Sequence, residues 1–192
     1  MLAIFLDIET TGLDPFRHRP IEIAVKIFDV NTGEKKGEYQ SVIRQSRENW
    51  DESDPKSIEV NGFTWDLIQT GLENGQVGKD IESFFENAGV VRGEAVFICQ
   101  NPAFDRAFFG HIVSVYRQED LNWPYHWLDL ASMYWSKVAQ EGKEFPGEMK
   151  LSKNAIAREY GIAPEEQPHR AMNGVDHLIL CYQKVLGVQL ES

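Results

Sequence analysis

The chain has 192 residues, with 19 Lys and Arg against 30 Asp and Glu, which gives a formal net charge of −11, and 42% of its residues are hydrophobic. A chain of this length predicts a single domain, residues 1–192, with a full core. The acidity counts against a broad electropositive surface of the kind that drives non-specific binding to duplexes. Any contact with nucleic acid must therefore be local or mediated by a metal ion.

The apolar segments are too short for a membrane anchor. No uninterrupted apolar run approaches the roughly 18 to 20 residues of a membrane span. The apolar start of the chain meets Asp7 and Glu9 with no basic segment before it and no cleavage site after it, so we expect no signal peptide. Cys99 and Cys181 lie in apolar stretches and cannot form a disulfide framework or a zinc cluster. A reducing, cytoplasmic location fits best.

The first part of the chain predicts three strands in series. Residues 2–8 form a short apolar run that ends in acids, and residues 11–15 follow as a turn. Residues 21–27 alternate between apolar and other side chains with the period of two that a strand requires, and residues 31–33 turn the chain back. Residues 39–44 predict the third strand.

The rest of the chain alternates between helical and extended patterns. One helix is expected to begin at residue 55 and to stop at Gly62, and a second to begin after Thr64, which caps it. Further helices are expected around 81–85, over 104–115, over 151–160 and over 175–186. Strands are expected at 95–99 and 127–128, and a mobile surface loop at 141–150. This order predicts an α/β fold with a mixed sheet and helices on its faces.

Four acids are candidate metal ligands. Asp7 and Glu9 are two apart on a strand, so both carboxylates project to the same face, where they repel each other unless a cation lies between them. Asp105 follows a buried strand and would lie at the carboxyl edge of the sheet, where α/β proteins usually place ligands. Asp176 is near the start of the last helix. Asp105 and Asp176 could each instead interact only with a helix N-terminus, and Asp7-x-Glu9 could simply face solvent.

The ligand types favour a hard cation. Carboxylate oxygens without cysteine or clustered histidine indicate Mg²⁺ or Mn²⁺ rather than zinc. His169 follows Pro168 in a polar loop and suits proton transfer near neutral pH, although a loop histidine is often only solvated. The remaining histidines have no partner pattern and receive no role: His18, His111, His126 and His177.

Three ordered segments carry a resemblance. They are residues 5–15 (Phe-Leu-Asp-Ile-Glu-Thr-Thr-Gly-Leu-Asp-Pro), 100–105 (Gln-Asn-Pro-Ala-Phe-Asp) and 168–171 (Pro-His-Arg-Ala). Together they resemble the three exonuclease motifs of the DEDDh (DnaQ-like) 3′-5′ exonucleases. Secondary matches at 20–24, 58–64 and 128–129 extend the likeness over residues 3 to about 186.

The resemblance implies a ribonuclease H-like fold, here with a five-stranded mixed sheet, and a site that hydrolyses the 3′-terminal phosphodiester to release nucleoside 5′-monophosphates. It implies two divalent ions, Mg²⁺ or Mn²⁺, held by Asp7, Glu9, Asp105 and a late acid, with His169 as the general base for the attacking water. Residues matching the terminal-nucleotide contacts are Thr10, Thr11, Gly12, Leu13, Phe63, Asn101 and Phe104. For Phe63, stacking on a base and burial in a core remain alternatives.

One position departs from the family pattern. The last acid is expected five residues after His169, where this chain has Gly174, and Asp176 lies two residues further on. We hypothesise that Asn173-Gly174 forms a turn before the helix begins and brings Asp176 into the metal site. A catalytically impaired nucleic-acid-binding homologue is the alternative from another functional class.

The expected partners are single-stranded DNA or RNA 3′ ends, and no membrane. Residues 60–64 look more like the epsilon proofreading subunits of bacterial DNA polymerase III than like oligoribonucleases, which favours DNA. An RNA-trimming exonuclease shares the same motifs, because they do not report contacts to the 2′-hydroxyl. Neither a homodimer nor a polymerase partner is decided by the sequence.

Overall fold

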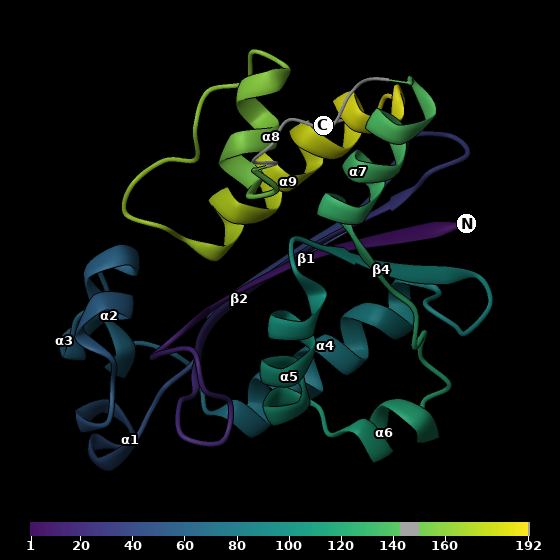
Figure 1. The fold of residues 1–192 in the computed structure, drawn as a ribbon. Helices are drawn as coiled ribbons and strands as arrows, with labels where there is room; N and C mark the ends of the chain where they lie inside the picture. The colour runs from purple at the N-terminus through teal and green to yellow at the C-terminus, as the bar shows by residue number, and fades with distance from the viewer. Residues whose placement is uncertain (143–149, 192) are drawn as a thin grey trace.

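A mixed sheet forms the centre of the molecule. The computed structural model describes residues 1–142 and 150–191, and Figure 1 shows its ribbon. The five strands are β1 (Leu2–Thr10), β2 (Pro20–Asp29), β3 (Lys35–Val42), β4 (Ala95–Cys99) and β5 (Trp127–Asp129), in the spatial order β3-β2-β1-β4-β5. β2 pairs antiparallel with β1 and β3, whereas β4 runs parallel to β1 and β5. This is the mixed α/β sheet that the sequence predicts.

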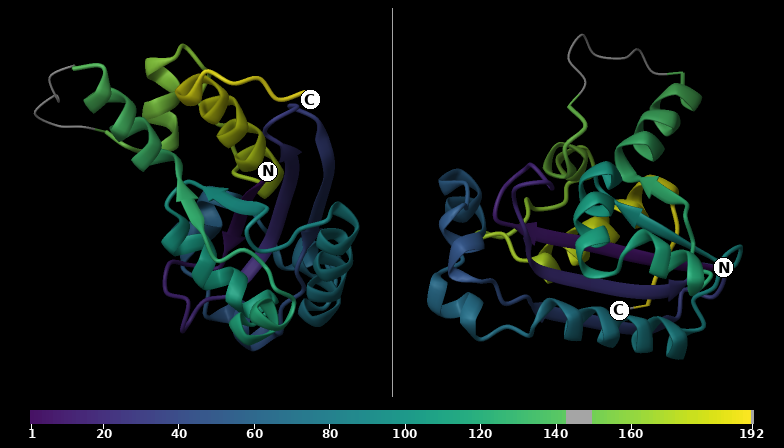
Figure 2. Two further views of the ribbon diagram at one scale, coloured as in Figure 1. Left: turned by 90° about the vertical axis from the view of Figure 1, so that its right-hand side faces the viewer. Right: turned by 90° about the horizontal axis from the view of Figure 1, so that it is seen from below.

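Helices cover both faces of the sheet, as Figures 1 and 2 show. One face carries α4 (Asn74–Ala88), α5 (Pro102–Ile112) and α6 (Val115–Asp120). The other carries α7 (Leu130–Gln140), α8 (Lys153–Glu159) and α9 (Ala171–Leu186). The short helices α1 (Arg47–Asp51), α2 (Pro55–Asn61) and α3 (Trp65–Gln69) lie at one end of the sheet.

Strand β1 separates two hydrophobic cores, because successive side chains of a strand point to opposite faces. Ile4, Leu6 and Ile8 belong to the core with α4 and α5. Ala3 and Phe5 belong to the core with α9, where the Phe5 ring meets the Tyr182 ring edge to face at 5.0 Å. The same row continues through residues 7 and 9, so β1 directs both acids toward the α9 side.

Most predicted elements are confirmed, including β1, β2, β4, α2 and α3. Gly62 ends α2 with a φ of 65°, a left-handed conformation that glycine adopts at little cost. Thr64 caps α3 by accepting a hydrogen bond from the Leu67 amide. The short helix α1 and the 11-residue helix α7 were not expected, and β3 begins at Lys35 rather than 39.

Two boundaries differ from the predictions. The helix expected over 104–115 ends at Ile112, because Val113 is extended and the Ser114 side chain caps a separate helix, α6. The last helix begins at Ala171 rather than at 175. Of the surface loop expected at 141–150, residues 143–149 lie outside the described residues. Both cysteines are buried and free, and none of the described helices is long and apolar enough to cross a membrane.

Candidate active site

Three carboxylates from two elements meet at the carboxyl edge of β1 and β4. Asp7 and Glu9 lie on β1, and Asp105 lies in the first turn of α5, which directly follows β4. Asp105 is 4% exposed, and its carboxylate accepts a hydrogen bond from the Ile8 amide. The parallel pairing of β4 with β1 places the start of α5 beside the end of β1.

Burial raises the pKa values of all three acids, and the charge of Asp7 adds to the shift of Glu9 and Asp105. Burial raises the pKa of Asp105 well above its usual range, and the neighbouring charge of Asp7 adds to the effect. Burial, followed by the charge of Asp7, raises the pKa of Glu9 from 4.5 to about 8. Burial also raises the pKa of Asp7, although Lys153 opposes the shift. Three acids so close together favour a positive charge between them.

His169 lies beside these acids, in the loop that connects α8 to α9 and passes next to α2 (Figure 1). Its backbone amide donates to the Val60 carbonyl at 3.0 Å, which fixes this loop to α2. Its Nδ1 lies 3.9 Å from Oε1 of Glu165, whose side chain is 3% exposed. Asp7 also interacts electrostatically with both His169 and Glu165. The predicted base thus lies near Asp7, one of the predicted ligands.

Gly174 faces the site directly. It lies on α9 so close to Asp7 that a Cβ at this position would overlap the Asp7 carboxylate. A side chain at position 174 would therefore need the Asp7 carboxylate to shift, and this is the position where an acid of the family pattern would enter the site. No carboxylate comes from this position.

The hypothesis that Asp176 enters the metal site is wrong. α9 runs unbroken from Ala171 through Gly174, so residue 176 is rotated by about 200° from residue 174 around the helix axis. The Asp176 side chain is 51% exposed and pairs with Lys26 on β2, away from Asp7. The helix begins early because Glu22 caps it, and the expected turn at Asn173-Gly174 does not form.

Glu22 positions α9 and the segment before it. This carboxylate is 1% exposed, and its Oε2 accepts a hydrogen bond of 2.9 Å from the Ala171 amide. Its Oε1 accepts from Gln40 Nε2 at 2.9 Å and from Arg170 Nη2 at 3.3 Å. An acid at a helix N-terminus satisfies an unpaired amide and the helix dipole together. Glu22 therefore fixes where α9 starts and where position 174 points.

Lys153 is a cation inside the acid cluster. This α8 side chain is 11% exposed, and its Nζ lies 2.9 Å from Glu165 Oε2 and 3.6 Å from Asp7 Oδ1. Nζ also donates to the Gly174 carbonyl at 3.1 Å. Burial alone would lower the pKa of Lys153, but the attraction of Asp7 and Glu165 outweighs burial and raises it. The ammonium is therefore held in its charged form.

A hollow of about 310 Å³ opens beside Glu9. Of the residues expected to contact the terminal nucleotide, Thr10, Leu13 and Phe104 line it. Val60 and Lys56 of α2 also line it. Leu13 is 72% exposed, so an apolar side chain stands at the rim. This hollow adjoins Glu9, one of the three acids.

Phe63, another residue expected to contact the nucleotide, lies in a hydrophobic core instead. Phe63 is 2% exposed, packs with Ile21 and Ile68, and lies under the Arg170 guanidinium at 4.1 Å. The core alternative for Phe63 is therefore correct, and stacking on a base is wrong.

Hydrogen bonds of Thr10 and Thr11 stabilise the turn after β1. Thr11 is fully buried, and its hydroxyl accepts a hydrogen bond from the Arg19 amide. The Thr10 hydroxyl donates to the Gly12 carbonyl at 2.8 Å. A Cβ on Gly12 would meet the His18 ring, so glycine is required there. Thr11 and Gly12 thus shape the turn, and Thr11 is not available for the expected contact.

Asn101 begins α5 and does not line the hollow beside Glu9. It is exposed in the left-handed region with a φ of 58°, and its amide donates to Asp129 Oδ1 at 3.1 Å. The nucleotide contact expected at Asn101 stays a prediction.

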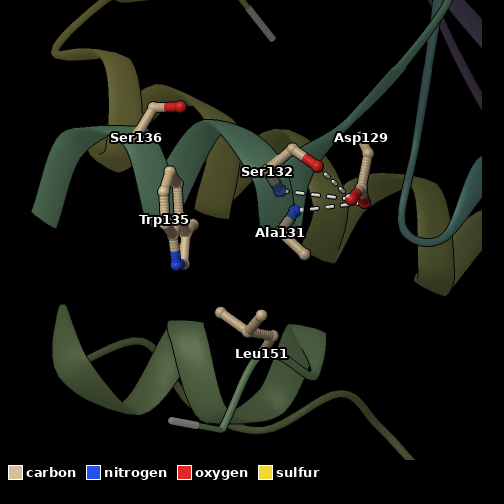
Figure 3. Close-up of a pocket in the computed structure, with 6 residues that line it drawn as sticks. All are labelled: Asp129, Ala131, Ser132, Trp135, Ser136 and Leu151. Carbon is tan, nitrogen blue, oxygen red and sulfur yellow. Dashed lines mark hydrogen bonds between the residues drawn. The ribbon is translucent and has the colours of Figure 1, made fainter. Parts of the chain in front are cut away.

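A second hollow of about 420 Å³ lies between α7 and the start of α8 (Figure 3). Trp135 and Leu151 face each other across it. At its end the Asp129 carboxylate accepts hydrogen bonds from the amides of Ala131 and Ser132. Asp129 therefore caps α7 and does not join the acids of the site.

Sequence reasoning missed Lys153, Glu165 and Glu22 as residues of the site. Glu22 lies in the secondary match at 20–24, and an acid within an apolar strand was an available signal. Glu165 lies four residues before His169 in the same polar loop, where an acid is usually solvated. Nothing in the local pattern of α8 distinguishes Lys153 from a solvated lysine.

The donor chemistry fits a hard divalent cation. Asp7, Glu9 and Asp105 supply buried carboxylate oxygens, which Mg²⁺ and Mn²⁺ prefer, and burial and repulsion leave their charges poorly compensated. Across residues 1–142 and 150–191, no three Asp, Glu, His or Cys side chains converge as a bound ion would require. Binding would therefore draw these side chains together.

Comparison with known proteins assigns the family. Residues 4–179 match the model of the exonuclease family RNase_T. The chain is 27% identical over 171 residues to a PolC-type DNA polymerase III of Thermotoga petrophila, covering 88% of this chain and 11% of that protein. The chain thus spans about a tenth of the length of this relative.

Solved exonucleases share the fold. An exonuclease I structure superposes with a TM-score of 0.78 at 19% identity, covering 98% of this chain and 41% of that one. Escherichia coli exonuclease I in complex with a dT13 oligonucleotide gives a TM-score of 0.76 at 19% identity, covering 96% and 40%. The architecture is therefore the ribonuclease H-like fold of exonucleases. With the family match over residues 4–179, this chain belongs to the DnaQ-like 3′-5′ exonuclease family, whose members are nucleases acting on phosphodiester bonds.

Proposed function

We propose that this chain is a metal-dependent 3′-5′ exonuclease that acts on single-stranded ends and releases nucleoside 5′-monophosphates. The observation that carries the proposal is that Asp7, Glu9, Asp105 and His169 lie near one another at one edge of the sheet, although they come from three separate segments of the sequence. Mg²⁺ or Mn²⁺ is the proposed cofactor, because the three acids are hard oxygen donors.

Each residue has a role in this reaction. Asp7, Glu9 and Asp105 would hold the divalent cation, which when bound stabilises the charge that develops on the phosphate oxygens. His169 takes a proton from the water that attacks the terminal phosphorus, and the bond to the 3′ oxygen of the preceding nucleotide breaks. The Nδ1 atom of His169 faces Glu165, which leaves Nε2 for the water. The carboxylate of Glu165 stabilises the protonated ring.

The hollow beside Glu9 supports a single-stranded substrate. It adjoins one proposed ligand and has the apolar Leu13 and Phe104 on its walls, which suit the face of a base. Exonuclease I of E. coli has been solved with a dT13 oligonucleotide, which supports DNA. An RNA-trimming activity remains the alternative within the family, because sugar discrimination depends on contacts to the 2′-hydroxyl.

A catalytically impaired nucleic-acid-binding protein is the second candidate. Two observations favour it: Gly174 supplies no carboxylate, and Lys153 places an ammonium against Asp7. Such a protein would bind oligonucleotides but would not shorten them.

Matched oligonucleotides distinguish these functions. Single-stranded DNA, single-stranded RNA and duplex DNA, each labelled at the 5′ end, should be incubated with the chain in Mg²⁺, Mn²⁺ or EDTA. We expect a ladder shortened from the 3′ end, mononucleotide 5′-phosphates as products, no reaction in EDTA, and faster loss of DNA than RNA. Binding without shortening in either metal would contradict the exonuclease proposal.

Two aspartate variants serve as a matched pair in this assay. Asp105→Asn should reduce the rate by at least about a hundredfold, because it removes a proposed ligand. Asp176→Asn should retain the wild-type rate within about twofold, because this carboxylate lies on the opposite side of α9. Equal effects of the two substitutions would contradict the assignment of the site.

A further inference from the structure

Lys153 lies where the acid cluster is incomplete. Position 174 points at Asp7, and glycine leaves no carboxylate there. The Lys153 Nζ reaches the same place, with the Gly174 carbonyl at 3.1 Å and Asp7 Oδ1 at 3.6 Å. At this point of the site the chain therefore lacks the carboxylate of the family pattern and has the Lys153 ammonium.

Glu165 holds this ammonium in position. Its Oε2 lies 2.9 Å from Nζ, and its side chain is 3% exposed. The Glu165 amide donates to Asn154 Oδ1 at 2.9 Å, so the residue next to Lys153 on α8 fixes the loop as well. Lys153 and Asn154 of α8 therefore both bind Glu165 in the loop between α8 and α9. This arrangement is a built ion pair, because both charged side chains are buried and have defined partners.

We propose that Lys153 is a permanent cation that takes the place of one of the two metal ions expected for the family, so that the chain binds one divalent ion per site. This proposal rests on the proposed function, in which Asp7, Glu9 and Asp105 hold that one ion. Glu165 is a positioning residue, since it acts by holding Lys153.

Charge balance explains the replacement. With an acid at 174, a second divalent ion would have that carboxylate and Asp7 as partners. Without that acid, one positive charge suffices at this place, and Lys153 supplies it without dissociating. A buried acid left without a cation would be costly, because charge is poorly tolerated away from water.

The ammonium also opposes a second dication. An ion bound to Asp7 Oδ1 at about 2 Å would lie within about 6 Å of the Lys153 Nζ. Like charges at that distance repel strongly in a partly buried site. The proposed ion can lie on the side of Asp7 that faces Glu9 and Asp105, farther from the ammonium, but two ions cannot both avoid it.

The number of Mn²⁺ ions bound per chain tests the proposal independently of activity. Bound Mn²⁺ is counted by titration calorimetry and by electron paramagnetic resonance of the free ion in the wild-type protein and in Lys153→Met. We expect one Mn²⁺ per wild-type chain and two per Lys153→Met chain, where two ions about 4 Å apart would show magnetic coupling. Lys153→Arg should remain at one, because it keeps the charge.

Lys26→Met is the matched control. Lys26 is also mostly buried, at 16% exposed, and it pairs with Glu38 and Asp176 on the other side of α9. It should bind one Mn²⁺, as the wild type does. A count of two in Lys26→Met would mean that removal of any nearby lysine raises the count, and would overturn the proposal.

Other outcomes separate the two proposals. Two Mn²⁺ ions in the wild-type chain, together with exonuclease activity, would overturn the role of Lys153 and leave the proposed function intact. No bound Mn²⁺ at all would overturn both. If Lys153→Met does not fold, Lys153→Gln gives the second measurement: it removes the charge and keeps a polar side chain, so the count should rise above one, and a count that stays at one would overturn the proposal.

Discussion

Glu9 makes the metal-free protein less stable as pH rises. Burial and the charge of Asp7 raise its pKa from 4.5 to about 8 in the folded protein. Below about pH 4.5 the carboxyl is protonated in both the folded and unfolded states. Between about pH 4.5 and 8 the unfolded chain releases the proton and the folded protein retains it, so the free energy of unfolding falls as pH increases. Above about pH 8 Glu9 is ionised in both states, and the free energy of unfolding is lowered by the full cost of the buried charge.

The size of this penalty follows from the pKa difference. At about 1.36 kcal/mol per pH unit, a rise from 4.5 to about 8 corresponds to at most about 5 kcal/mol. Because Glu9 shares its repulsion with Asp7 and other acids, we expect roughly half of this from Glu9 alone. Glu9→Gln removes the charge and should therefore raise the free energy of unfolding by about 2 to 3 kcal/mol at pH 9, with little effect at pH 5.

Urea unfolding in EDTA at pH 5, 7 and 9, followed by circular dichroism, measures the effect. Glu59→Gln, which removes an exposed carboxylate on α2, is the control and should follow the wild type. Mg²⁺ should reduce the difference between the wild type and Glu9→Gln at pH 9, because the bound cation favours the charged carboxylate. If Glu9→Gln and the wild type lost stability equally between pH 5 and 9, the reasoning from burial and repulsion would be refuted.

Three further substitutions test the site and its support. Asp7→Asn should abolish hydrolysis in both Mg²⁺ and Mn²⁺ while the protein stays folded, and more than about a tenth of the wild-type rate would contradict its role as a ligand. His169→Ala should lower kcat by roughly 10² to 10⁴ with unchanged Mn²⁺ affinity, as steady-state kinetics and metal titration can show. Glu22→Gln should lower the free energy of unfolding by about 1 to 3 kcal/mol, because Arg170 loses its charged partner and the Ala171 amide loses a charged acceptor; unchanged urea unfolding would contradict this.

Local patterns determined much of the fold and part of the site. The period of two in β1 places residues 7 and 9 on one face, and this follows from strand geometry alone. Asp105 could be placed because α5 directly follows the buried strand β4. Gly62 and Thr64 ended and began helices through their own backbone and side-chain properties. Each of these features depends on residues a few positions apart in the chain.

Phe63 was undecided from the sequence because its burial depends on distant residues. The same aromatic side chain could face a base or a core, and the decision came from Ile21 on β2 and Arg170 before α9. The boundary of α5 at Ile112 has a local cause: the apolar spacing continues to Val115, although the backbone leaves the helix at Val113 and Ser114 caps a new helix. Spacing reports which face of a helix is apolar and does not report where the helix ends.

The tertiary structure alone decided the fourth position of the site. The sequence identified Gly174 as a departure from the family pattern, but the choice of Asp176 required a turn at Asn173-Gly174 that local preference favours. Glu22, about 150 residues away in the sequence, caps Ala171 instead and starts the helix early, so the rotation of α9 points Gly174 at Asp7 and Asp176 at Lys26. The rotation of a helix depends on where it begins and on what packs against it. For α9, Glu22 of β2 sets the start of the helix, and β2 lies about 150 residues before α9 in the sequence.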